Sequence, residues 1–166
     1  MEKITRPVSG YLALLLVLLC NGAAVFLATH NDANANKIVL AIVLFIVGIF
    51  LAAGLLVNQP NQARVLTFFG KYVGTARENG LLFVNPLYKK QKISYRSENL
   101  ESSRLKVNDK MGNPIEIAAV IVWKVADTYK ACFEVQDFSQ YVKIQSEASV
   151  RHLATSFPYD HMEGEH

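Results

Sequence analysis

The chain has 166 residues, with 17 Lys and Arg, 14 Asp and Glu, and a formal net charge of +3. This near balance, without a clustered basic face, argues against a nucleic-acid-binding protein. The two cysteines, Cys20 and Cys132, lie in segments of different character, so we expect no disulfide between them and a reducing compartment is acceptable.

An apolar segment, residues 11–28, follows a short start that carries Lys3 and Arg6. Its length favours a first transmembrane helix. A basic start before an apolar middle also fits a cleaved signal peptide, and both interpretations stay open. Within the segment, Asn21 offers a hydrogen bond to a second helix and Gly22 permits close approach, although lipid-facing helices also tolerate such residues.

A second apolar segment, residues 38–57, is the feature around which the chain is organised. It reads IVLAIVLFIVGIFLAAGLLV and contains no charged or polar side chain. As a helix it would be about 30 Å long, the thickness of a bilayer's hydrocarbon core. Because a backbone in lipid must satisfy its own hydrogen bonds, the segment predicts a transmembrane helix. The short polar stretch 29–37 would then be the loop of a helical hairpin.

The positive charges predict the orientation of this hairpin. Cytoplasmic flanks of transmembrane helices are enriched in Lys and Arg. Basic residues lie before the first segment and after the second, namely Lys3, Arg6, Arg64, Lys71 and Arg77. We therefore expect a multi-pass protein of the cell membrane, with both ends and the soluble part in the cytoplasm and the 29–37 loop outside.

The remaining 109 residues suffice for one soluble domain. Alternating apolar residues predict strands over 63–69, 81–84 and 89–97, the last as an edge strand, and again around 105–107; residues 71–74 fit a return strand or a loop. Residues 115–126 predict a twelve-residue strand whose centre is buried on both faces. Asp127 and Asp137 are expected to cap helices over 128–133 and 138–156, and Pro158 to end the second.

Three segments carry a family resemblance: QARVLTFFGK at 62–71, NGLLFVNPL at 79–87 and VNDKMGNPIEIAAVIVWKVAD at 107–127. Together with the helix that follows, their order and spacing over about residues 60–160 resemble the SPFH, or band 7, family of stomatins, prohibitins and flotillins. Asn79 stands where that family usually has proline. Family members usually continue into a long helical coiled-coil region, so a chain that stops at His166 resembles a fragment or a truncated member.

Taken with the two apolar segments, the resemblance implies an α+β fold: the N-terminal transmembrane helical hairpin predicted above, which is less common in the family than a single anchor, followed by an SPFH-like domain of antiparallel strands with helices. The expected divisions are a membrane anchor at 1–57 with helices at about 11–28 and 38–57, an SPFH domain at 58–160 and a polar tail at 161–166.

The implied function is a non-enzymatic scaffold that oligomerises at the membrane and organises lipid microdomains or membrane-protein complexes. The alternative is an adaptor that regulates a membrane protease or transporter without forming a ring. The implied partners are membrane lipids, further copies of the chain and another membrane protein.

No catalytic, cofactor-binding or metal-binding residues are expected. One group near the end, His152, His161, Glu163, Glu165 and His166, suggests a metal site, but the last four lie in a stretch that predicts no scaffold to fix them. Cys132 fits either a reactive or acylated thiol or, as favoured here, a small buried core residue.

One basic cluster is a candidate for the membrane surface: Lys89, Lys90, Lys92 and Arg96. These residues could contact anionic lipid headgroups. They could equally protect a solvated edge strand from aggregation. Packing and turn roles are expected for a separate set of residues: Phe68, Phe69, Gly80, Phe83, Pro86, Ile117, Ile121 and Trp123.

Overall fold

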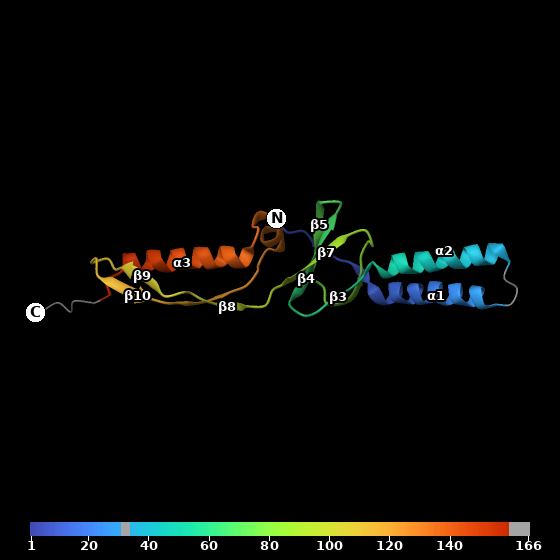
Figure 1. The fold of residues 1–166 in the computed structure, drawn as a ribbon, viewed down its shortest axis with the longest axis horizontal. Helices are drawn as coiled ribbons and strands as arrows, with labels where there is room; N and C mark the ends of the chain where they lie inside the picture. The colour runs from blue at the N-terminus through green and yellow to red at the C-terminus, as the bar shows by residue number, and fades with distance from the viewer. Residues whose placement is uncertain (31–33, 160–166) are drawn as a thin grey trace, which may run out of the picture. The chain divides into compact units, whose positions relative to one another are not determined.

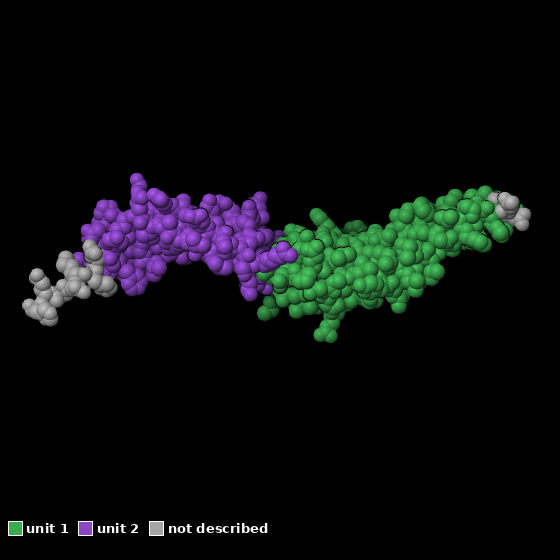
Figure 2. All heavy atoms as spheres, turned by 90° about the horizontal axis from the view of Figure 1, so that it is seen from below, with its two compact units in different colours: residues 1–95 green, residues 96–166 purple. Residues whose placement is uncertain are grey.

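The computed structural model describes residues 1–30 and 34–159, so part of the 29–37 loop and the tail 161–166 lie outside the described residues. The chain divides into two compact units, Met1–Tyr95 and Arg96–His166, which Figure 2 colours separately. Both units combine helices with strands, and apart from one parallel pair of strands the pairings are antiparallel. The expected α+β class, with a helical hairpin before the strands, is confirmed.

The first unit consists of a helical hairpin and two small sheets. Its elements are β1 (Ile4–Thr5), β2 (Val8–Ser9), α1 (Gly10–Thr29), α2 (Ala35–Ala52), β3 (Leu55–Asn58), β4 (Gln62–Phe68), β5 (Lys71–Ala76), β6 (Gly80–Phe83) and β7 (Lys89–Ser94). One sheet has the order β1-β5-β4-β7 and the other has the order β2-β6-β3. The strand β7 is therefore at an edge of its sheet, as the sequence predicts.

The two helices pack side by side (Figure 1). The helix α1 exceeds the predicted range by one residue at each end. The prediction for α2 is wrong at its end, because the helix stops at Ala52 and the residues from Leu55 to Val57 belong to β3. Gly54 separates the two elements, and β3 obtains its hydrogen bonds from β6 instead of from a continuing helix.

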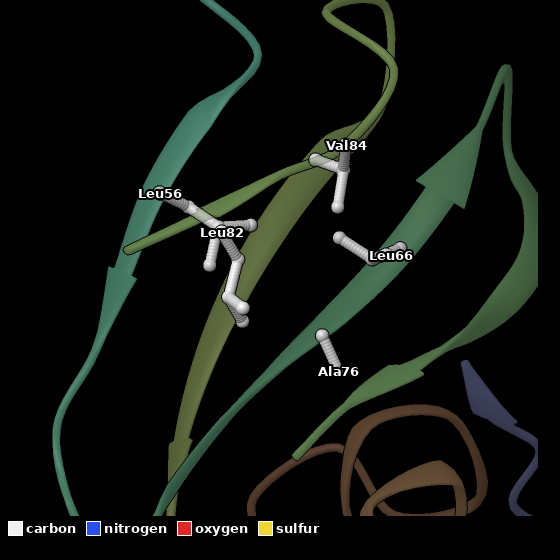
Figure 3. Close-up of a cluster of buried hydrophobic side chains, with 5 residues drawn as sticks. All are labelled: Leu56, Leu66, Ala76, Leu82 and Val84. Carbon is white, nitrogen blue, oxygen red and sulfur yellow. The ribbon is translucent and has the colours of Figure 1, made fainter. Parts of the chain in front are cut away.

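Five buried side chains form the hydrophobic core between the two sheets of the first unit: Leu56, Leu66, Ala76, Leu82 and Val84 (Figure 3). Val73 and Tyr88 pack against this cluster. Burying a Leu or Val side chain contributes about 1.5–3 kcal/mol. The expected packing role of Phe69 is wrong, since its side chain is 85% exposed and its backbone lies at a positive φ of 46° in the β4–β5 turn.

The second unit contains β8 (Glu98–Glu101), β9 (Leu105–Asn108), β10 (Pro114–Ile117), β11 (Val120–Trp123), the π-helical turn η1 (Lys130–Glu134) and α3 (Phe138–Ser156). The predicted twelve-residue strand over 115–126 is wrong. It is divided into β10, which pairs with β9, and β11, which pairs with β8. At the division, Ala119 N donates to Ser102 Oγ at 2.8 Å, so a side chain replaces a ladder hydrogen bond.

The expected burial of this segment on both faces is also wrong. Val120 and Val122 are 68% and 66% exposed, whereas Ile121 and Trp123, on the other face, are partly buried. The Trp123 ring contacts the ring of Phe138 at a centroid distance of 5.9 Å. The strand β11 therefore uses only one face within the chain.

The helix α3 has the predicted range, and Asp137 caps it by accepting a hydrogen bond from Gln140 N at 3.1 Å. The shorter helix predicted over 128–133 is present as a turn that continues into η1, with Lys130 N donating to Asp127 Oδ1 at 3.1 Å. The polar cap residues thus locate both helix starts correctly.

Candidate membrane-facing site

The helices α1 and α2 are both long and apolar enough to cross a membrane by length and composition. With 20 and 18 residues, they are about 30 Å and 27 Å long. Large apolar side chains on both helices, such as Leu15, Leu19, Ile42 and Ile46, are exposed. A core helix of a soluble protein would bury such residues, so this distribution is typical of helices that face lipid.

Small residues bring α1 and α2 together. Ala24 and Ala41 are buried in the contact, and Gly48 lies against the side chain of Asn21. A Cβ atom built on Gly48 would lie 2.8 Å from Asn21 Nδ2, too close for a carbon at that position. The predicted role of Gly22 in close approach is wrong, because a Cβ there would meet nothing within 4 Å.

Asn21 does not make the expected hydrogen bond to the second helix. Its Nδ2 donates to Val17 O, one turn earlier in α1, at 2.9 Å. Its Oδ1 is buried without a hydrogen-bond partner among the described residues. The Asn21 side chain therefore contributes contact with Gly48, which is van der Waals packing of the kind that holds helices together in lipid.

Both helices join the soluble sheets at β6. The strand β2 leads directly into α1 and β3 follows α2, and these two strands lie on either side of β6. A Cβ on Gly10, the first residue of α1, would lie 2.8 Å from Leu82 N, and one on Gly54 would lie 2.5 Å from Val84 O. Backbone contacts this close leave room only for glycine, so the anchor and the sheet form one packed structure.

The first residues of the chain also belong to this unit. The strand β1 pairs in parallel with β5, and Thr75 N donates to Lys3 O at 2.7 Å. Arg77 forms an ion pair with Glu2, and Tyr95 Oη donates to Glu2 Oε1 at 3.0 Å. The hydrogen bond to Glu2 raises the pKa of Arg77. Cleavage of a signal peptide would remove all of these contacts, so the arrangement favours a retained first helix.

The strand β7 does not present its three basic candidates on one side. Lys89, Lys90 and Lys92 lie on β7, where alternation places Lys90 and Lys92 on one side and Lys89 on the other. Arg96 begins the second unit. Lys90 Nζ donates to the carbonyl oxygen of Ala53, directly after α2. Burial, together with the nearby charge of Arg64, lowers the pKa of Lys90.

The sequence analysis did not group Arg64 with Lys90 and Lys92. It used Arg64 only as a sign of orientation, yet β4 places the residue directly opposite Lys92 on β7. The signal was present in the two strand predictions, because pairing 63–69 with 89–97 in antiparallel fashion puts Arg64 beside the lysines.

Two other candidates from the sequence are the metal site and the thiol of Cys132. Within 1–30 and 34–159 no group of three or more His, Cys, Asp or Glu residues could hold a metal ion, and His161, Glu163, Glu165 and His166 lie outside those ranges. His152 is exposed on α3. The thiol of Cys132 is partly buried, and this burial raises its pKa, which disfavours the reactive thiolate.

A family profile, the SPFH domain / Band 7 family, matches residues 56–165. The chain belongs to this family. The resemblance expected from the three sequence segments is thereby confirmed. The matched range contains both units' strands from β3 onward as well as α3. SPFH proteins of the stomatin type are generally membrane-associated scaffolds, in agreement with the two apolar helices.

Two stomatin homologs of archaea are similar to this SPFH protein. The one from Pyrococcus horikoshii is 28% identical over 117 residues, which cover 70% of this chain and 44% of the relative. The one from Pyrococcus abyssi is also 28% identical over 117 residues, covering 70% of this chain and 43% of the relative. The match spans less than half the length of either relative.

Proposed function

We propose that this chain is a non-enzymatic membrane scaffold that oligomerises at the membrane and organises lipid microdomains or membrane-protein complexes. The observation that carries this proposal is the continuity between the apolar hairpin and the SPFH fold. The helix α1 follows β2 directly, only Ala53 and Gly54 separate α2 from β3, and β2 and β3 pair with the same strand of the soluble sheet. A domain held in this way at a bilayer is suited to building a surface assembly.

Exposed apolar surface in the second unit supports the oligomerisation. Val120 and Val122 project from the outer face of β11 and are more than 60% exposed. The helix α3 has no buried residue, and its Tyr141, Ile144 and Leu153 are at least half exposed. Exposed apolar side chains on both elements are consistent with interaction sites. In the proposed assembly, further copies of the chain cover it.

The proposed orientation is multi-pass in the cell membrane, with the soluble part cytoplasmic. The positive-inside distribution of Lys and Arg supports it. The pairing of β1 and β2 with β5 and β6 also supports it, since both strands precede α1 while their partners follow α2. The division into an anchor at 1–57, an SPFH domain at 58–160 and a tail at 161–166 stays a prediction.

The test is the native mass of the full chain after extraction from membranes in a mild detergent or polymer. We expect a discrete particle of many copies. Val122→Lys should reduce the particle's size, because it places a charge on the exposed apolar face of β11, whereas Lys106→Gln, at an exposed side chain of β9, should leave it unchanged. A wild-type chain that runs as a single copy bound to another membrane protein would contradict the scaffold and favour an adaptor.

A further inference from the structure

Arg64 and Lys92 are directly opposite one another on the paired strands β4 and β7. Lys90 is two residues from Lys92 and opposite Leu66, so the three cationic side chains project from the same side of the sheet. Like charges in directly opposite positions destabilise a strand pair. An anion bound beside these three side chains would offset the repulsion between them.

The protein itself does not provide that anion within the described residues. None of Arg64, Lys90 and Lys92 forms an ion pair there. Arg64 Nε is buried without a hydrogen-bond partner in the same part of the chain. A buried N–H donor without an acceptor destabilises the folded protein. The surroundings of Lys90 likewise disfavour its positive charge. Burial lowers the pKa of Lys90, and the nearby charge of Arg64 lowers it further.

The position of Lys90 places this cluster at the end of the hairpin. Its ammonium donates to the carbonyl oxygen of Ala53, the residue that follows the last residue of α2. If α2 crosses the bilayer, its end marks the level at which the chain leaves the hydrocarbon. Lipid phosphates lie in the interfacial layer that begins at this level. Cationic side chains near helix ends extend toward this layer.

We propose that Arg64, Lys90 and Lys92 bind the phosphate of an anionic phospholipid at the end of α2. The guanidinium group of Arg64 supplies donors suited to two-point recognition of phosphate oxygens, and the two ammonium groups add positive charge. The site rests on the proposed membrane function. It keeps Lys90 and Lys92 from the basic cluster predicted from the sequence and adds Arg64. Lys89 projects from the opposite side of the sheet and is not part of the site.

The test uses the full chain reconstituted in phosphatidylcholine bilayers, with spin-labelled phosphatidylglycerol and spin-labelled phosphatidylcholine as probes. We expect the wild type to prefer the anionic probe. Lys92→Gln should reduce this preference by about fivefold, the effect of one cation near an anionic surface, and adding Arg64→Gln should bring it close to unity. Lys89→Gln on the same strand is the matched control and should keep most of the wild-type preference.

Three results would overturn the site. The first is an unchanged preference in Lys92→Gln, whose exposed side chain can be replaced without risk to folding. The second is an equal loss in Lys89→Gln, which would mean diffuse surface charge instead of a site. The third is displacement of the labelled lipid by inorganic phosphate at constant ionic strength, which would show binding of the free ion.

The native mass of the same samples separates this proposal from the proposed function. A wild-type particle of many copies that shows no lipid preference would overturn the lipid site and leave the scaffold intact. A wild-type preference that Lys92→Gln removes, in a chain that stays monomeric, would support the lipid site and contradict the scaffold.

Discussion

Arg77 and Glu2 are 75 positions apart in the sequence and form a two-point ion pair, in which Arg77 Nε donates to Glu2 Oε1 at 2.9 Å and Nη2 donates to Oε2. The Arg77 guanidinium also lies over the ring of Tyr95, 4.7 Å from its centroid. The start of the chain, before the first apolar helix, is thereby fixed to the strands that follow the second helix.

Replacing Glu2 with alanine should loosen the N-terminal strand β1. An ion pair that is partly open to solvent contributes up to about 1 kcal/mol, and Arg77 is 38% exposed in its side chain. We therefore expect hydrogen exchange of the Thr75 amide, which donates to Lys3 O, to accelerate by up to about fivefold in Glu2→Ala. Mass spectrometry of the exchanged chain measures this rate, and Glu78→Gln is the control at an exposed carboxylate nearby. Equal rates in both variants would show that the ion pair does not hold the strand.

The same relationship predicts the topology of the hairpin. Because β1 and β2 pair with β5 and β6, an epitope placed before Met1 and one placed after His166 should lie on the same side of the membrane. An epitope inserted between α1 and α2 should lie on the other side. Protease digestion of sealed vesicles of both orientations tests this, and we expect both ends to be cytoplasmic. Protection of the first epitope while the second is digested would contradict the arrangement.

Gly48 should be far more sensitive to substitution than Gly22. A Cβ on Gly48 would lie within 3.0 Å of three Asn21 atoms, whereas one on Gly22 has open space. Overpacking of this kind costs about 1–3 kcal/mol. Gly48→Ala should therefore destabilise the hairpin in reversible unfolding in mixed micelles, and Gly22→Ala should be neutral or slightly stabilising.

A double variant makes the Gly48 prediction specific. Asn21→Ala removes the side chain that the new methyl group would meet, so Asn21→Ala with Gly48→Ala should recover part of the lost stability. If the two effects simply add, contact between these two side chains is not the cause of the loss.

The sequence predicts the elements that carry strong local signals. The capping residue Asp137 and the periodic apolar positions after it locate α3 at its observed range. The strand break at Ala118 and Ala119 could not be predicted, because local alternation continues through it. The break depends on hydrogen bonds with Ser102, a residue 17 positions away from Ala119.

The sequence contains a local signal for the end of α2, but the apolar run that continues past it led to a longer predicted helix. Gly54 is a typical residue at a helix end, but the apolar run continues to Val57 without a polar residue. Only the tertiary pairing of Leu55–Asn58 with β6 decides between helix and strand. The two-residue strands β1 and β2 carry no periodicity at all, so the role of the first nine residues was not predictable. The site is different, because pairing the two predicted strands in antiparallel fashion already places Arg64 beside the lysines, and the structure adds the register that puts Arg64 opposite Lys92.

Asp109 should make the second unit sensitive to acid. Its carboxylate accepts hydrogen bonds from Tyr159 N at 3.0 Å, Asn113 N at 2.7 Å and Met111 N at 2.9 Å. The hydrogen bond from Tyr159 is the largest cause of a pKa below the usual carboxyl value, followed by those from Asn113 and Met111. The charged form is therefore favoured by folding, and it holds the β9–β10 turn against the residues after α3.

The lowered pKa of Asp109 determines how the stability of the second unit changes with pH. The stabilisation by Asp109 is fully present above the unfolded carboxyl pKa, about 3.9, and is lost as the pH falls through the lower folded value. Asp109→Asn should lower stability at neutral pH, and the difference from wild type should shrink in acid. Fluorescence of Trp123, the single tryptophan, reports unfolding of this unit. Glu116→Gln is the matched control, because its pair with Lys106 spans 3.7 Å between side chains that are 53% and 83% exposed. A difference between wild type and Asp109→Asn that stays constant from neutral pH to below the folded pKa would show that the carboxylate charge is not the source of the stabilisation.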